Sequence, residues 1–319
     1  MQNAIPMHAF IKVQLVFRTS LTLLAGILFA TSYAADTIRI AATTTMVADL
    51  ARSVAGDRAE VSGLMGPGVD PHLYKATAPD INTLQSADVI FYNGLHLEGR
   101  LADILVKLGR RNKPVYAVTE SIPEEKLLEP AEFEGHYDPH VWFDPRLWAH
   151  CIETVVNALA EIDPDHADGY RQRGAATEQA YQNHYQWGID YLATIPEKQR
   201  VLITSHDAYN YFGRAFDFRV IGVQGISTQS EAGLADMVKI IEFIKKNDIK
   251  AIFVESSVSP AAIQRISEAS DCAIGGELFS DAMGLPGHIE TAANGDSFDV
   301  GTYEGMVKAN ISTIADALR

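Results

Sequence analysis

Short apolar runs alternate with amphipathic stretches along the chain from Thr37 onward. The apolar runs have the length and composition of strands, and the stretches between them have the spacing of amphipathic helices. This alternation is typical of βα units around a mostly parallel sheet. The sequence therefore predicts an α/β fold of two lobes, each a mostly parallel sheet flanked by helices. The predicted strands are Ile38–Thr43, Ala59–Met65, Asp88–Tyr92 and Pro114–Val118 in the first lobe, and Val201–Thr204, Arg219–Val223, Ala251–Glu255 and Cys272–Glu277 in the second.

Two helices can be predicted in more detail. One lies between the second and third strands of the second lobe, and Ser230 is a suitable N-cap for it. The other covers residues 165–195, where Asp163-Pro164 supplies an N-cap followed by proline at the first helical position. The alternative is two shorter helices broken near Gly174, because an internal glycine weakens a helix. A single long helix would be a stiff linker between the lobes and would restrict hinge bending.

The first 35 residues differ from the rest. Lys12 and Arg18 precede the mostly apolar run Leu21–Phe29, and small residues follow it before Asp36. These are the parts of a cleavable secretory signal, with cleavage expected after Ala34. A membrane anchor is the alternative, but the run is shorter than the ~18 apolar residues that a span requires. The expected organisation is a signal peptide (1–34), an N-terminal lobe (35–163), a linker helix (164–196) and a C-terminal lobe (197–319). We expect the exported protein to be located in a periplasm.

Composition narrows the possible functions. The chain has 319 residues, 41 acidic against 26 basic side chains, and a formal net charge of −15. Nucleic acid is an unlikely partner for so acidic a protein, because binding it requires Lys and Arg against the phosphates. The two cysteines, Cys151 and Cys272, are too few for a disulfide framework or a thiolate zinc cluster, and neither is near the signal, which disfavours a lipid anchor. We expect both thiols to be reduced and buried, and any metal to depend on His, Asp and Glu.

Four segments place a metal-binding side chain in a turn-rich context. His72, His206 and Asp281 follow the carboxyl ends of predicted strands, whereas His140 lies in a loop bounded by prolines. In open α/β sheets, ligands bind in the crevice outside those carboxyl ends, so these side chains should converge on one cleft with two donors from each lobe. Three imidazoles and a carboxylate suit a divalent first-row metal. The segments are Gly66–Tyr74, Tyr137–Pro145, Ile203–Tyr209 and Leu278–Gly284.

Each of these residues also has a simpler interpretation. A single loop histidine is more often a surface residue or a helix cap than a ligand, and His206-Asp207 could open the next helix. Asp281 precedes a Gly-Leu-Pro-Gly sequence and could belong to an ordinary turn. The metal hypothesis therefore depends on the four segments together.

The motifs Asp-Pro-His-Leu-Tyr ending at Tyr74, Asp-Pro-His-Val-Trp ending at Trp142, Ser205–Tyr209 and Ser280-Asp281 resemble, in order and spacing, those of the TroA-, PsaA- and ZnuA-like metal receptors of ABC importers. The resemblance covers essentially the whole chain after the signal, and its donor set is that of the His-His-His-Asp subgroup. It implies that a monomeric solute-binding protein captures a divalent metal and delivers it to the permease subunits of an ABC importer in the membrane. Carried over, the ligands are His72, His140, His206 and Asp281.

The sequence does not decide whether the bound metal is Mn²⁺ or Zn²⁺. Zinc receptors of this family usually insert a long His-rich loop before the second ligand, whereas Ile122–Asp138 contains only His136. The three imidazoles and the general affinity order of divalent metals favour Zn²⁺ instead. His136 is a candidate auxiliary ligand, although a solvated loop histidine is the commoner case. Glu255, at a strand end, is a candidate for accepting hydrogen bonds from the ligand-bearing loops.

The alternative function is a secreted zinc-dependent hydrolase that uses the same ligands. We expect no catalytic residues and no enzyme activity, for two reasons. Four protein donors fill a tetrahedral site, and a catalytic zinc normally keeps one position free. The chain also lacks a His-Glu-x-x-His helix and an obvious general base beside the ligands.

Overall fold

The structure of the protein is a computed structural model, which describes residues 37–133 and 135–319. Residues Thr37–Arg319 form one compact unit. The predicted signal peptide, residues 1–34, lies outside the described residues. The predicted α/β fold class is confirmed, and the chain on each side of the long helix α6 (Ala167–Leu192) builds its own parallel strands. We call these parts the N-terminal half (37–163) and the C-terminal half (197–319).

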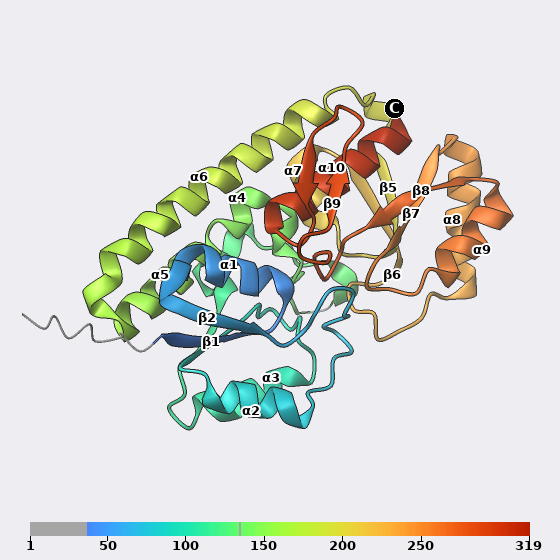
Figure 1. Ribbon diagram of the computed structural model, residues 1–319. Helices are drawn as coiled ribbons and strands as arrows, with labels where there is room; N and C mark the ends of the chain where they lie inside the picture. Colours follow the sequence, from blue (N-terminus) through green and yellow to red (C-terminus); the bar gives the residue numbers. More distant parts are fainter. Residues whose placement is uncertain (1–36, 134) are drawn as a thin grey trace, which may run out of the picture. The chain divides into compact units, whose positions relative to one another are not determined.

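The N-terminal half is built on a parallel sheet with the strand order β2-β1-β3-β4. In its centre, Ile40 of β1 pairs with Val61 of β2 on one side and with Val89 of β3 on the other. Side chains alternate between the two faces of a strand, so Ile40 packs in the core cluster that contains α1, whereas Ala41 packs in the cluster that contains α2 and α3. Figure 1 shows these helices on opposite faces of the sheet. The elements are β1 Ile38–Ala42, α1 Thr45–Ala55, β2 Ala59–Gly63, α2 Ala78–Ser86, β3 Val89–Tyr92, α3 Leu101–Gly109, β4 Val115–Ala117, α4 Pro145–Trp148 and α5 Cys151–Ile162.

The C-terminal half repeats this layering. Strands β5 and β6 form one parallel pair, β7 and β8 form another, and β5 lies next to β7. Ile203 and Ile252 pack with α8 and α9, whereas Leu202 and Phe253 pack on the opposite face with α7 and α10. The elements are β5 Val201–His206, α7 Asn210–Phe216, β6 Arg219–Gln224, α8 Leu234–Asn247, β7 Ala251–Glu255, α9 Ala261–Ser270, β8 Ala273–Leu278, β9 Ile289–Thr291, β10 Ser297–Asp299 and α10 Tyr303–Leu318.

One local prediction for a helix start is wrong, and another is confirmed in position but without the expected capping bond. Helix α8 begins at Leu234 with Gly233 as its N-cap, not near Ser230. Asp163 precedes the short 3-10 helix Pro164–His166, but its carboxylate makes no capping bond to the backbone. It accepts hydrogen bonds from the guanidinium of Arg58 and the hydroxyl of Tyr170 instead. The Asp163 carboxylate therefore pairs with these side chains and does not cap the helix.

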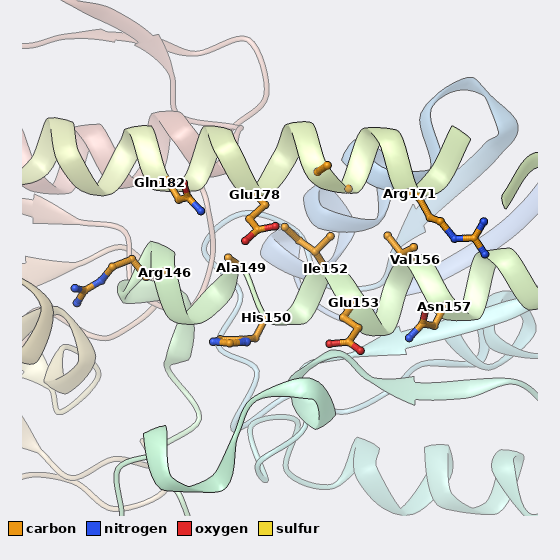
Figure 2. Close-up of a pocket in the computed structure, with 12 residues that line it drawn as sticks. Arg146, Ala149, His150, Ile152, Glu153, Val156, Asn157, Arg171, Glu178 and Gln182 are labelled. Atoms are coloured by element: carbon orange, nitrogen blue, oxygen red, sulfur yellow. The ribbon is translucent and has the colours of Figure 1, made fainter. Parts of the chain in front are cut away.

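The predicted long helix is confirmed as α6, and Gly174 does not break it. A Cβ at Gly174 would lie 2.7 Å from Cγ2 of Val156, so the glycine allows α6 to pack closely against α5. Figure 2 shows the groove that remains between the two helices, with Ile152 and Val156 on α5 facing α6 and charged side chains such as Glu178 along it. Gly174 is therefore a packing glycine.

One large hydrophobic cluster runs through both halves of the chain. It joins residues of β1 and α1 to residues of α6, α7, β7 and α10. Cys151 and Cys272 are both free and buried, as predicted. Among the described residues, no helix has the length and apolar character needed to cross a membrane. Because the halves share packed side chains, a wide separation between them would expose apolar surface at a cost of ~25 cal/mol per Å².

Candidate metal centre

Strand ends carry two of the predicted site residues. His206 is the last residue of β5, and Asp281 lies in the loop that follows β8. The loop around Asp281 is fixed by hydrogen bonds to its backbone, because the Trp142 indole N–H donates to the carbonyl of Ser280 at 3.0 Å. The Tyr209 hydroxyl donates to the carbonyl of Phe279 at the same distance.

The other two residues, His72 and His140, each end an Asp-Pro-His sequence in a loop. His72 lies between β2 and α2, and His140 directly precedes the 3-10 helix Val141–Phe143. In both loops the aspartate accepts the backbone N–H of the histidine, at 2.8 Å for Asp70 and at 3.0 Å for Asp138. In this turn a side chain accepts the backbone N–H of the residue two positions later. The turn therefore fixes the backbone position from which each imidazole projects.

The structure brings the four predicted residues together. One donor atom from each of His72, His140, His206 and Asp281 lies within 4.8 Å of all the others. The Nε2 atoms of His72 and His140 are 3.3 Å apart, and the Asp281 carboxylate lies 3.4 Å from Nε2 of both His140 and His206. His140, His206 and Asp281 are at most 1% exposed, and His72 is 5% exposed. The donors form an enclosed cluster to which both halves of the chain contribute two residues.

The centre of this cluster contains polar atoms that need a partner. Within the described residues, Nε2 of His206 and both carboxylate oxygens of Asp281 are buried without a hydrogen bond. Buried polar groups of this kind are costly, at ~1–3 kcal/mol each and more for a charged group. The residues present therefore fit a cation held between the imidazoles and the carboxylate.

Carboxylates also hold two of the imidazoles from outside the cluster. Nδ1 of His140 donates to Asp138 at 2.7 Å, and Nδ1 of His206 donates to Glu255 at 2.5 Å. Glu255 accepts the backbone N–H of His206 as well, at 2.8 Å. Such outer partners fix the tautomer that directs Nε2 toward a metal and increase the basicity of the ring.

These carboxylates decide the protonation of the metal-free site. Burial lowers the pKa of His140, but Asp138 and Asp281 outweigh it and raise the pKa to about 9. The pKa of His206 is raised in the same way by Glu255 and Asp281 against the effect of burial. The two imidazoles in turn hold the pKa of the Asp281 carboxyl well below its usual range although the group is buried. The metal-free site thus holds protons that a metal must displace.

His72 behaves in the opposite way. Burial lowers its pKa to about 3, and the neighbouring imidazoles of His140 and His206 add to the decrease, while Asp281 opposes it. The Asp70 carboxylate bonds the backbone of His72 and the hydroxyl of Thr228, at 2.6 Å, and not the ring. His72 is therefore a neutral donor at any pH near 7.

A buried network behind the site was not predicted. Glu98 accepts hydrogen bonds from the Thr43 hydroxyl at 2.8 Å and from the backbone N–H of Asn93 at 2.5 Å. The Asn93 side chain donates to the carbonyl of Pro139, next to His140. Burial raises the pKa of Glu98 to about 7. This network ties the ends of β1 and β3 to the loop that carries His140.

Sequence reasoning also gave no role to Asp70 and Asp138, although the repeated Asp-Pro-His sequence was a signal that could have identified them. His136, the candidate auxiliary ligand, is exposed and does not belong to the cluster of four. Its ring lies beside that of His96, with centroids 4.2 Å apart.

Together, the α/β fold and the enclosed donor set define a protein built to enclose a cation between two halves of its chain. Comparison with known proteins agrees with this class. Residues 40–317 match the family described as ZnuA, the periplasmic component A of the zinc-uptake complex, and the chain belongs to that family. The family supplies a component of an uptake system and not an enzyme.

Individual relatives are similar over most of their length. The manganese-binding lipoprotein MntA of Bacillus subtilis is 41% identical over 314 residues, which cover 93% of this chain and 99% of the relative. The zinc-binding protein TroA of Treponema pallidum is 42% identical over 278 residues, 86% of each chain. The solved structure of the periplasmic zinc-binding protein TroA from Treponema pallidum superposes with a TM-score of 0.82 at 40% identity, covering 88% of this chain and 99% of that one.

Proposed function

We propose that this protein binds a divalent transition metal, Mn²⁺ or Zn²⁺, and delivers it to the permease of an ABC importer. The ligands are His72, His140, His206 and Asp281. The observation that carries the proposal is the enclosed cluster itself, with its donors within 4.8 Å of one another and its central oxygens without a hydrogen bond among the described residues. The metal is cargo, so the site must both hold it and give it up.

The chemistry of the donors supports this cargo. Asp281, Asp138 and Glu255 place three carboxylates in or directly behind the cluster. Once the imidazoles are neutral, these carboxylates favour a dication. Three imidazoles suit Zn²⁺, and Mn²⁺ accepts imidazole with carboxylate. Similar relatives are named for both metals, so the proposal covers both.

A zinc-dependent hydrolase is less well supported. Catalytic zinc keeps a position free for water, whereas four protein donors converge here. The carboxylates nearest to the cluster, Asp138 and Glu255, already accept the outer N–H groups of His140 and His206. Neither is available as a general base, and the relatives are named for metal binding and not for hydrolysis.

The family assignment gives the protein an extracytoplasmic location. We further propose that residues 1–34 are a cleaved signal peptide, that the mature protein is a periplasmic monomer, and that residues 35–163 and 197–319 act as two lobes joined by 164–196. The partner is the membrane permease of the importer. Mass spectrometry of the protein recovered from its own cells tests the cleavage site, and light scattering tests the monomer.

Metal titration tests the ligands. Metal-free protein should bind one Mn²⁺ or Zn²⁺ tightly per chain, and Asp281→Ala should abolish that event because it removes the only carboxylate among the four donors. His288→Ala is the control, since this histidine is exposed and outside the cluster. Unchanged tight binding in Asp281→Ala would refute the assignment. Competition between the two metals, with elemental analysis of protein from its own cells, identifies the physiological cargo.

Uptake tests delivery. Cells that lack the protein should accumulate less of the metal from a metal-poor medium. The intact protein should restore accumulation, and the Asp281→Ala variant should not. If cells that lack both the protein and any second importer still accumulated the metal fully, metal binding would be separate from transport. That result would refute the delivery role.

A further inference from the structure

A second cavity lies in the N-terminal half, between the turn that follows β3 and the loop that precedes His140. Its volume is about 560 Å³, and none of the four proposed ligands lines it. Its lining brings together two imidazoles and three carboxylates from segments that are distant in sequence. These residues are His96, Glu98, Glu120, Glu124 and His136.

The two imidazoles are already close. The rings of His96 and His136 meet edge to face with their centroids 4.2 Å apart, and Phe133 packs on His136 from the side at 5.4 Å. Both histidines are exposed, and among the described residues no hydrogen bond engages either ring. Two imidazoles in contact and open to solvent can both donate to one metal ion without a change of fold.

Buried hydrogen bonds hold the turn that carries His96 in place. Leu95 and His96 have φ angles of 51° and 66°, in the left-handed region that favours glycine. The buried Glu98 carboxylate accepts the backbone N–H groups of Asn93 and Gly94 and so fixes the start of this turn. The ring of His96 is thus presented by a backbone conformation that residues other than glycine rarely adopt and that its surroundings maintain.

The charge of the cavity favours a cation. Glu120 and Glu124 line it, and its described lining contains no Lys or Arg. The Tyr137 hydroxyl donates to the Glu124 carboxylate at the rim. Imidazole and carboxylate side chains are both common ligands of divalent metals.

We propose that His96 and His136 form a second, surface-accessible divalent-metal site, completed by water and by a Glu120 or Glu124 side chain that must turn toward the metal, because among the described residues no third donor already lies beside the two rings. Two imidazoles and one flexible carboxylate bind more weakly than the enclosed cluster of four. Imidazole donors and the general affinity order favour Zn²⁺ over Mn²⁺ at this site. The site is independent of the proposed cargo site, because the two share no ligand.

Calorimetric titration of the metal-free full chain with Zn²⁺ tests the proposal. We expect one tight event and one weaker event per chain. The double variant His96→Gln/His136→Gln should weaken the second event at least tenfold and leave the tight event unchanged. A single event in the unmodified protein, or a second event that survives in the double variant, would overturn the proposal. Mn²⁺ should give a second event at least tenfold weaker than that of Zn²⁺.

Two more variants distinguish this site from nonspecific binding and from the proposed cargo site. His288→Gln removes an exposed histidine that also lies near a carboxylate, Glu290. It should keep both events, and loss of the weaker event there would mean nonspecific binding to surface histidines. Asp281→Ala should lose the tight event and keep the weaker one. Retention of the weaker event supports the second site whether or not the cargo proposal holds, and its loss would refute an independent site.

Discussion

The two Asp-Pro-His loops place chemically different histidines in one site. Both loops use the aspartate to accept the backbone N–H of the histidine. Asp138 also bonds the ring of His140, whereas the second oxygen of Asp70 bonds Thr228 in the opposite half. The same three residues therefore fix one imidazole as a basic, oriented ligand and leave the other ring without a carboxylate partner.

This difference follows the position of each loop. The Asp138 loop is buried, and its second oxygen and its carbonyl accept from Asn210 and Tyr211 of the other half. The Asp70 loop lies at the surface, where His72 borders a cavity of about 460 Å³ together with Leu73, Arg100 and Gln229. His140 is thus the ligand anchored by the other half, and we expect metal to enter and leave on the side of His72.

Of the two loop histidines, His140 should have the larger effect when it is removed. A four-ligand metal site is worth ~10–16 kcal/mol, so one ligand contributes roughly 3 kcal/mol, more than a hundredfold in affinity. We expect His140→Ala to lower the metal affinity by more than this amount. His72→Ala should lower it about tenfold less than His140→Ala does, because only the ring of His140 is oriented by a carboxylate. Calorimetry with Mn²⁺ and Zn²⁺ measures both. Equal losses would contradict the distinction between the anchored ligand His140 and His72 at the cavity, and circular dichroism would check that both variants fold.

The two aspartates give the next largest contrast. Asp138→Asn should weaken metal binding ~10–100-fold, the usual cost of losing an outer carboxylate on a ligand histidine. Asp70→Asn should cost much less, since the amide oxygen can still accept the N–H of His72 and no ring contact is lost. A matched titration of the two variants measures the difference. If Asp70→Asn were as damaging as Asp138→Asn, the roles of the two loops would be equivalent after all.

Part of this arrangement could be predicted from sequence because it is local. Apolar runs marked the strands to within about two residues, and Ala251–Glu255 matches β7 at both ends. The hairpin of β9 and β10 was missed because its strands have three residues each and are largely exposed, so they carry no apolar pattern. The four site residues could be identified because turns and strand ends are themselves sequence features.

The contacts behind the site could not be predicted in the same way. Glu98 meets Thr43 only because β1 and β3 are adjacent in the sheet, and nothing in its own neighbourhood in sequence indicates burial. The difference between Asp70 and Asp138 also has no local cause, since both belong to the same tripeptide. It arises from which part of the other half faces each carboxylate.

Metal affinity should rise with pH because of the anchored histidine. A metal binds the neutral imidazole, and the metal-free pKa of His140 is about 9, so a proton must leave at any lower pH. Affinity should increase about tenfold per pH unit for each displaced proton between pH 6.5 and 9. His72, with a pKa of about 3, adds nothing in this range. Titrations at several pH values measure the slope, and Asp138→Asn should flatten it.

The metal-free fold should show the opposite trend. The pKa of His140 is higher in the folded protein than the ordinary value of 6.5, so its contribution to stability is complete below pH 6.5 and is lost as pH rises through about 9. The thermal unfolding midpoint of metal-free protein should therefore fall over this interval. An unfolding midpoint that rises with pH would contradict the assigned protonation of His140.

The smallest predicted effect concerns release of the metal on the side of His72. The Thr228 hydroxyl donates to Asp70 at 2.6 Å and joins the two halves beside His72, while the large shared core opposes wide opening. Loss of one such hydrogen bond is worth ~1 kcal/mol, so Thr228→Val should speed metal release to a chelator about fivefold, and Thr228→Ser should restore the original rate. Stopped-flow mixing with a chelator measures the rates. Release that is unchanged in Thr228→Val, but faster in Asn210→Ala on the anchored side, would place the exit beside His140 and reverse the comparison between the loops.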